Sequence, residues 1–131
     1  MAIQTTFMRD NFATEEQIHK SIVDFLNIVL PENALFHHSP NEGKNHIAWI
    51  VKQKKLGCVS GWPDLEIFCP GHSVIFLEIK TKRGRLSPNQ RMIKEQFAKI
   101  KLPYFICRSV DDVEKALQQQ GVELKTFRVS D

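Results

Sequence analysis

The sequence has few cysteines and no long apolar run, and both absences restrict the class of protein. Its three cysteines, Cys58, Cys69 and Cys107, are odd in number and widely spaced, which argues against a disulfide framework and a zinc site. No apolar run approaches the roughly 20 residues that cross a bilayer, and Met1 to Phe12 lacks the layout of a signal peptide. The sequence therefore predicts a soluble, cytoplasmic protein with no membrane partner.

No repeat, linker or low-complexity segment divides the chain, and its length suffices to bury a core without metal or disulfide staples. We expect a single domain of 131 residues, with residues 1–13 as a flexible or accessory N-terminal segment. Hydrophobic residues make up 42% and charged residues 25%, which excludes disorder but selects no function. His37, His38, His46 and His72 do not show the spacing of zinc ligands, so none is assigned to a metal.

The net charge of +3 hides an uneven distribution along the chain. Residues 44–108 carry thirteen Lys and Arg against four acids and sum to +9, whereas residues 1–43 sum to −4 and residues 109–131 to −2. A basic middle segment suggests a polyanionic partner. The alternative is that these cations only solvate helix faces, and charge alone does not decide between the two.

Apolar periodicity and turn residues predict alternating helices and short strands. The expected helices cover residues 15–30, 45–56, 88–101 and 110–120, and the expected strands cover 34–38, 64–69, 73–80, 104–107 and a last edge strand over 122–129. Thr14 and Ser87 stand where helix N-caps are expected. The runs 64–69 and 73–80 flank a Pro-Gly-His turn and predict an antiparallel hairpin. This order predicts an α/β fold with a central mixed sheet flanked by helices.

Several aromatic and aliphatic side chains are expected to build the core. We expect Trp49 to be buried, and Trp62 to pack at the start of its strand in preference to stacking on a base or sugar. The helix after Ser87 should turn one apolar side inward, formed by Met92, Ile93, Phe97 and Ile100.

Two acids and a lysine fall on the predicted hairpin in a pattern that suits metal chemistry. Asp64 and Glu78 lie on neighbouring strands, and Lys80 follows Glu78 on the same face. Mg²⁺ takes oxygen ligands, and the backbone carbonyl of Ile79 can add one to the two carboxylates. Lys80 would then hold the attacking water or the scissile phosphate.

A plainer interpretation exists for each motif taken alone. Pro-Asp after a Gly-Trp turn is a common strand start, and Glu-Ile-Lys often marks an exposed face. However, Glu78 ends an otherwise apolar strand, where a charge without a partner would be costly. Metal ligation would supply that partner.

Together these motifs resemble the PD-(D/E)XK nucleases, and in particular the short stand-alone type of the VRR-NUC family. The matching residues are Asn41-Glu42-Gly43, Gly57, Gly61-Trp62-Pro63-Asp64, Glu78-Ile79-Lys80 and the run from Gly84 to Gln90. The similarity extends from about Glu15 to Val110, and the ordered set makes a chance match unlikely. The resemblance implies a restriction-endonuclease-like core, hydrolysis of phosphodiester bonds with Mg²⁺ or Mn²⁺, and DNA as the substrate.

The resemblance also gives roles to two further residues. Glu15 would be an additional acid at the metal, with Glu16 as the alternative, although a first-turn acid of a capped helix explains Glu15 equally well. Gln90 matches the glutamine that the family places near its catalytic lysine. Without the resemblance, Gln90 would be an ordinary surface residue in a first helical turn.

A cluster of cations follows the proposed metal site. Lys82, Arg83 and Arg85 surround Gly84, and phosphate contacts from such side chains give affinity without reading a base. This loop is therefore the leading candidate for contact with DNA. Other candidate DNA contacts are Asn41, Lys55 and Arg91, of which the two cations could equally be solvated surface.

The sequence thus predicts a metal-dependent DNA endonuclease that is structure-selective, acts on branched DNA or four-way junctions and reads little sequence. A homodimer with two sites on a two-fold axis would suit a four-way junction. A DNA-binding module without turnover is the alternative. A structural or protein-interaction domain would leave Glu78 unexplained.

Overall fold

The computed structural model describes residues 12–40 and 47–125, which form one four-stranded mixed sheet with helices on both faces. The strands are β1 (Leu35–His38), β2 (Leu65–Phe68), β3 (Ile75–Ile79) and β4 (Tyr104–Cys107). They lie in the order β1-β2-β3-β4, with the first two pairs antiparallel and β3 parallel to β4. The predicted hairpin is confirmed, because Leu65 pairs with Leu77 and Ile67 with Ile75.

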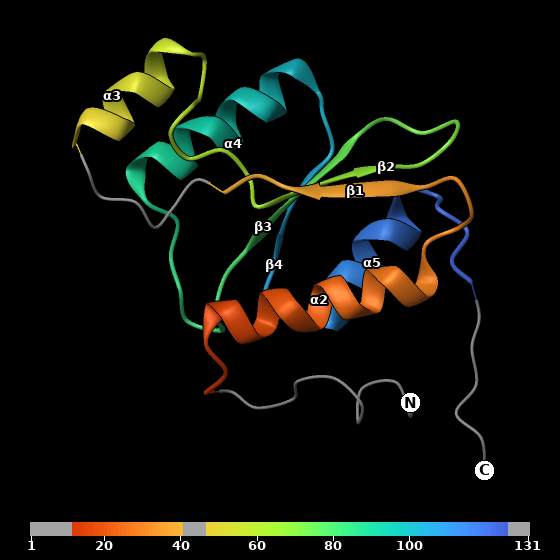
Figure 1. Ribbon diagram of the computed structural model, residues 1–131. Helices are drawn as coiled ribbons and strands as arrows, with labels where there is room; N and C mark the ends of the chain where they lie inside the picture. Colours follow the sequence, from red (N-terminus) through yellow and green to blue (C-terminus); the bar gives the residue numbers. More distant parts are fainter. Residues whose placement is uncertain (1–11, 41–46, 126–131) are drawn as a thin grey trace.

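Helices cover the two faces unequally (Figure 1). The described helices are α2 (Glu15–Val29), α3 (Ile47–Lys55), α4 (Pro88–Ile100) and α5 (Val110–Gln119). Figure 1 shows α2 and α5 together on one face of the sheet and α4 on the other. The predicted α/β architecture is therefore confirmed.

The main core lies between the sheet and the pair α2 and α5. A capping box between Thr14 and Gln17 starts α2, as the sequence predicts, and its apolar stripe is buried. Because side chains alternate along a strand, Leu77 and Ile79 of β3 face this core, while Glu78 between them faces the α4 side. This alternation puts a carboxylate on a strand whose every residue is buried.

The opposite face holds a smaller aromatic cluster. Trp62 packs edge-on against Phe76 and Phe97, and Phe97 in turn packs edge-on against Tyr104, with ring centroids 5.3 to 5.6 Å apart. The prediction that Trp62 packs at the strand start is therefore confirmed. The inward stripe predicted for α4 is wrong in part, since Met92 and Ile100 are 66% and 54% exposed and Phe97 is the one apolar residue that α4 buries.

Two further expectations need correction. Trp49 is 39% exposed, because α3 has no buried residue and does not enter the core. Residues 122–125 form no strand; the chain instead runs back to α2, where the Lys125 N–H donates to the Val29 carbonyl over 2.7 Å. The rest of that predicted strand, and residues 1–11 of the predicted N-terminal segment, lie outside the described residues.

Among residues 12–40 and 47–125, no helix has both the length and the apolar character that crossing a bilayer requires.

Candidate metal centre

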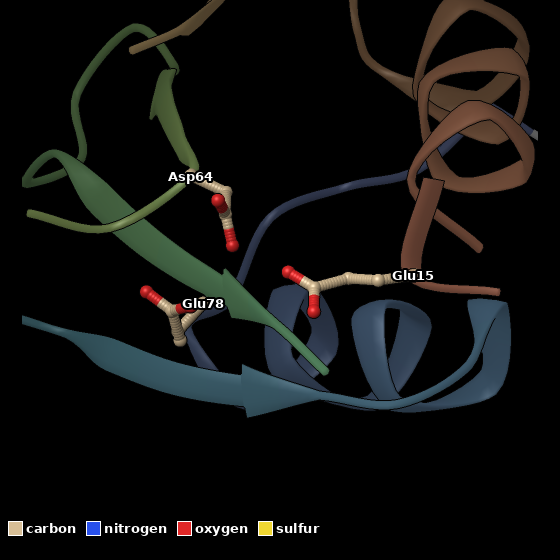
Figure 2. Close-up of side chains that lie close together, drawn as sticks. All are labelled: Glu15, Asp64 and Glu78. Carbon is tan, nitrogen blue, oxygen red and sulfur yellow. The ribbon is translucent and has the colours of Figure 1, made fainter. Parts of the chain in front are cut away.

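Three carboxylates from separate elements meet at one end of the sheet. Glu15 is the first residue of α2, Asp64 stands directly before β2, and Glu78 lies in β3. One oxygen of each lies within 4.8 Å of the others. Figure 2 shows the three side chains close together, coming from α2, the turn before β2 and β3. The expected convergence of Asp64 and Glu78 is thus present, and Glu15 joins them, whereas Glu16 is exposed.

The turn before Asp64 is fixed by a close contact with α4. Gly61 has φ of +82°, and a Cβ there would lie 2.6 Å from the carbonyl carbon of Asn89 and 2.8 Å from the backbone nitrogen of Gln90. Both the backbone conformation and the lack of space require glycine at this position. The contact sets the turn directly against the first residues of α4.

Hydrogen bonds from two strands hold Asp64 itself. Its Oδ2 accepts from the Ile79 N–H over 2.7 Å, and its backbone carbonyl accepts from the Ser39 N–H over 3.0 Å. The same carbonyl lies 2.9 Å from Nδ1 of His38, which must donate because a carbonyl only accepts. In a strand, the N–H and C=O of one residue point to the same side, so the Ile79 carbonyl also faces the Asp64 side.

Glu66 adds a second set of restraints around this turn. Its Oε2 accepts from the Trp62 indole N–H over 2.6 Å and from the Ser39 hydroxyl over 3.0 Å, and its Oε1 lies 3.3 Å from Nδ1 of His37. One carboxylate therefore joins β1, β2 and the turn that carries Asp64.

Glu78 is the most deeply buried of the three acids, with 1% of its surface exposed. Its Oε2 accepts from Gln90 Nε2 over 3.1 Å and lies 3.9 Å from Lys80 Nζ. The pKa of Glu78 is raised to about 9, first by burial and then by the charge of Asp64, a side-chain hydrogen bond with Asp64 and the charge of Glu15, while Lys80 lowers it. Its Oε1 is buried and has no hydrogen-bond partner among the described residues. An orphaned buried oxygen beside two more carboxylates fits a hard divalent cation.

Lys80 and Gln90 lie next to Glu78 and are also buried. Both are 8% exposed. Gln90 has two partners at once, because its Oε1 accepts from the Ser87 N–H in the capping box of α4 while its Nε2 donates to Glu78. Gln90 therefore lies in the site and is not an ordinary surface residue; its role in catalysis stays a prediction.

The candidate DNA contacts among the described residues are exposed side chains. Lys82, Arg83 and Arg85 are exposed on the loop after Lys80. Arg91 is also exposed and donates to the Leu86 carbonyl, and Lys55 ends α3 on the surface. Asn41 lies outside the described residues.

A cleft of about 880 Å³ opens beside Glu15 and Asp64. His19 and His38 line it with their rings in edge-on contact, 4.6 Å between centroids. Burial and the neighbouring His38 lower the pKa of His19, against the opposing effect of Asp64. His19 and Glu66 were not singled out from the sequence, because no local motif marks residues that meet across strands.

The chain is similar to a known domain family in sequence and to two solved structures in fold. Residues 9–111 match the VRR-NUC domain family. One solved structure, described as a VRR-NUC domain protein, has a TM-score of 0.67 and 22% identity, and the match covers 82% of this chain and 88% of that one. A second, described as a VRR-NUC domain, has a TM-score of 0.56 and 22% identity, with 81% and 97% covered. No curated protein matches the chain. The fold is therefore the restriction-endonuclease-like α/β fold that the sequence predicts.

Proposed function

The chain belongs to the VRR-NUC domain family, and on that premise we propose that it is a DNA endonuclease that hydrolyses phosphodiester bonds with Mg²⁺ or Mn²⁺. One observation carries the proposal. Three carboxylates from α2, the turn before β2 and β3 converge within 4.8 Å, and the most buried of them has an oxygen without a partner among the described residues. A cluster of like charges around a buried acid is costly unless a cation or proton neutralises it.

Glu15, Asp64 and Glu78 would hold the metal, with the Ile79 carbonyl as a further ligand on the Asp64 side. When bound, the metal offsets the charge that builds on the phosphate oxygens and lowers the pKa of a coordinated water. Glu78 must lose its proton to become a ligand, since burial keeps that acid neutral near pH 7.

Lys80 and Gln90 would orient the reacting groups. Lys80 Nζ lies 3.9 Å from Glu78 Oε2, so its ammonium can hold a water or a phosphate oxygen next to the acids. The Gln90 amide fixes the Glu78 carboxylate through one hydrogen bond. Each residue therefore limits the positions open to the group that attacks phosphorus.

The exposed cations after Lys80 support DNA as the substrate. Lys82, Arg83 and Arg85 would contact phosphates, which gives affinity but no sequence specificity. We extend the proposal to structure-selective cleavage of branched DNA or four-way junctions by a homodimer, because a two-fold axis would present two such sites to a symmetric junction.

Asp64→Asn and Lys80→Ala test the proposal, with Asp24→Asn as a matched control at a half-exposed acid of α2 that pairs with Lys20. Plasmid nicking and cleavage of flap, four-way and linear duplex DNA are followed with Mg²⁺ or Mn²⁺. Each site variant should lose about 100-fold or more in rate, since metal and charge stabilisation contribute several kcal/mol, while the control should cleave normally.

The results also separate the alternatives. Salt-dependent DNA binding by the wild-type protein without cleavage would favour a non-catalytic DNA-binding module. Equal cleavage of all substrates by a monomer would reject the structure selectivity and the homodimer but keep the nuclease.

A further inference from the structure

A single arginine, Arg108, contacts the backbone of the loop that follows Lys80. We call residues 81–85 the cationic loop, since three of its five residues are Lys82, Arg83 and Arg85. Nη1 of Arg108 donates to the carbonyls of Thr81 over 2.6 Å and Gly84 over 2.7 Å and lies 3.2 Å from that of Lys82. One guanidinium nitrogen thus contacts three backbone carbonyls of the loop.

Arg108 is itself fixed at the end of the sheet. The preceding residue, Cys107, accepts the Lys80 N–H in the β3–β4 pairing over 3.1 Å. The Arg108 N–H donates to Asp112 Oδ2 over 2.8 Å, at the start of α5. Its side chain therefore extends from a rigid position directly opposite the residue where the cationic loop begins.

The loop also has backbone order of its own. It contains one turn, in which the Gly84 N–H donates to the Thr81 carbonyl over 3.1 Å, and Gly84 lies close above the Lys80 side chain. Its three cations repel one another, and all three are exposed. A loop ordered only when DNA binds would lose affinity to the entropy cost of ordering.

The carbonyls turn inward to Arg108, and the cationic side chains of Lys82, Arg83 and Arg85 are left on the outside. We propose that Arg108 is a positioning residue that pre-orders the cationic loop for contact with the DNA backbone. This inference rests on the proposed function, because it takes DNA as the loop's ligand. A lysine cannot replace this arrangement fully, since an ammonium is a compact donor on a flexible stem.

Arg108→Ala and Arg108→Lys test the inference, and Lys115→Ala is the matched control that removes one positive charge from an exposed position of α5. Trypsin cleavage after Lys82, Arg83 and Arg85, mapped by mass spectrometry without DNA, reports the order of the loop. The Kd for labelled duplex and branched DNA is measured with Ca²⁺, and kcat and KM are measured with Mg²⁺.

For Arg108→Ala we expect faster trypsin cleavage within the loop and a Kd and KM raised about tenfold, with kcat at saturating DNA within about twofold. Arg108→Lys should fall between this variant and the wild-type protein, and it also covers the case in which the alanine variant does not fold. Lys115→Ala should match the wild-type protein in every measurement.

Two results would overturn the inference, and a third would overturn the proposed DNA endonuclease function on which it rests. An unchanged rate of trypsin cleavage would show that Arg108 does not order the loop. A lower midpoint of thermal unfolding with an unchanged Kd would show a purely structural role. If the wild-type protein bound no DNA at all, the proposed function would fail with it, and this result is distinct from both.

Discussion

The neutral isostere Glu78→Gln should make the metal-free protein more stable while it removes one ligand of the proposed metal centre. Burial and neighbouring carboxylates raise the pKa of Glu78 from 4.5 to about 9. Between these two values the folded protein keeps a proton on Glu78 that the unfolded chain releases. The free energy of unfolding of the wild-type protein should therefore fall as pH rises through this window and level off above it.

The size of the effect follows from the width of the window. At pH 7 the unfolded chain gains about 3 kcal/mol from ionising a group with a pKa of 4.5, a gain the folded state lacks. Glutamine is neutral in both states, so Glu78→Gln should be more stable than wild type by about 3 kcal/mol at pH 7. The difference should be about 2 kcal/mol at pH 6 and about 5 kcal/mol at pH 8.

Urea unfolding in EDTA at these pH values measures the difference, with Glu123→Gln as a control at an exposed position. Added Mn²⁺ should stabilise the wild-type protein and leave Glu78→Gln unchanged, because only the carboxylate can join Asp64 and Glu15 as a ligand. If wild type and Glu78→Gln showed the same pH dependence, the buried proton on Glu78 would be refuted.

Two further predictions concern the residues around this acid. Glu15→Gln should weaken Mn²⁺ binding in calorimetry about tenfold, while the exposed neighbour Glu16→Gln should not; equal effects would assign the wrong acid to the site. Gly61→Ala should cost about 3 kcal/mol in urea unfolding, because it combines a positive φ with a Cβ 2.6 Å from the Asn89 carbonyl carbon. Gly71→Ala has a similar φ of +79° and open space, so it should cost about 1 kcal/mol, and equal losses would disprove the close contact.

Local signals in the sequence predicted most of the fold. Capping residues are read from a few neighbouring positions, so the starts of α2 and α4 at Thr14 and Ser87 agree with the structure. The hairpin of β2 and β3 was equally accessible, because a short turn separates two β-rich runs. With the hairpin correct, the approach of Asp64 to Glu78 followed from strand geometry.

The errors arise where tertiary packing decides. An apolar stripe predicts the inward side of a helix only if something covers it, and the sheet face beneath α4 is filled by Trp62, Phe76 and Tyr104 with Phe97 alone from the helix. The role of Arg108 in the cationic loop could not be found either. Its three acceptors are backbone carbonyls 24 to 27 residues away, and carbonyls leave no trace in a sequence.

The double use of Gln90 restricts which residue can occupy position 90. In the capping box, glutamine and glutamate are equivalent at position 90, because either offers an oxygen to the Ser87 N–H. The contact with Glu78 distinguishes them, since a glutamate would have no N–H for Glu78 and would add a fourth carboxylate to the proposed metal centre. A change from glutamine to glutamate that would leave an ordinary helix start intact should therefore disturb the proposed metal centre. The amide at position 90 is required by the neighbouring acid and not by the helix.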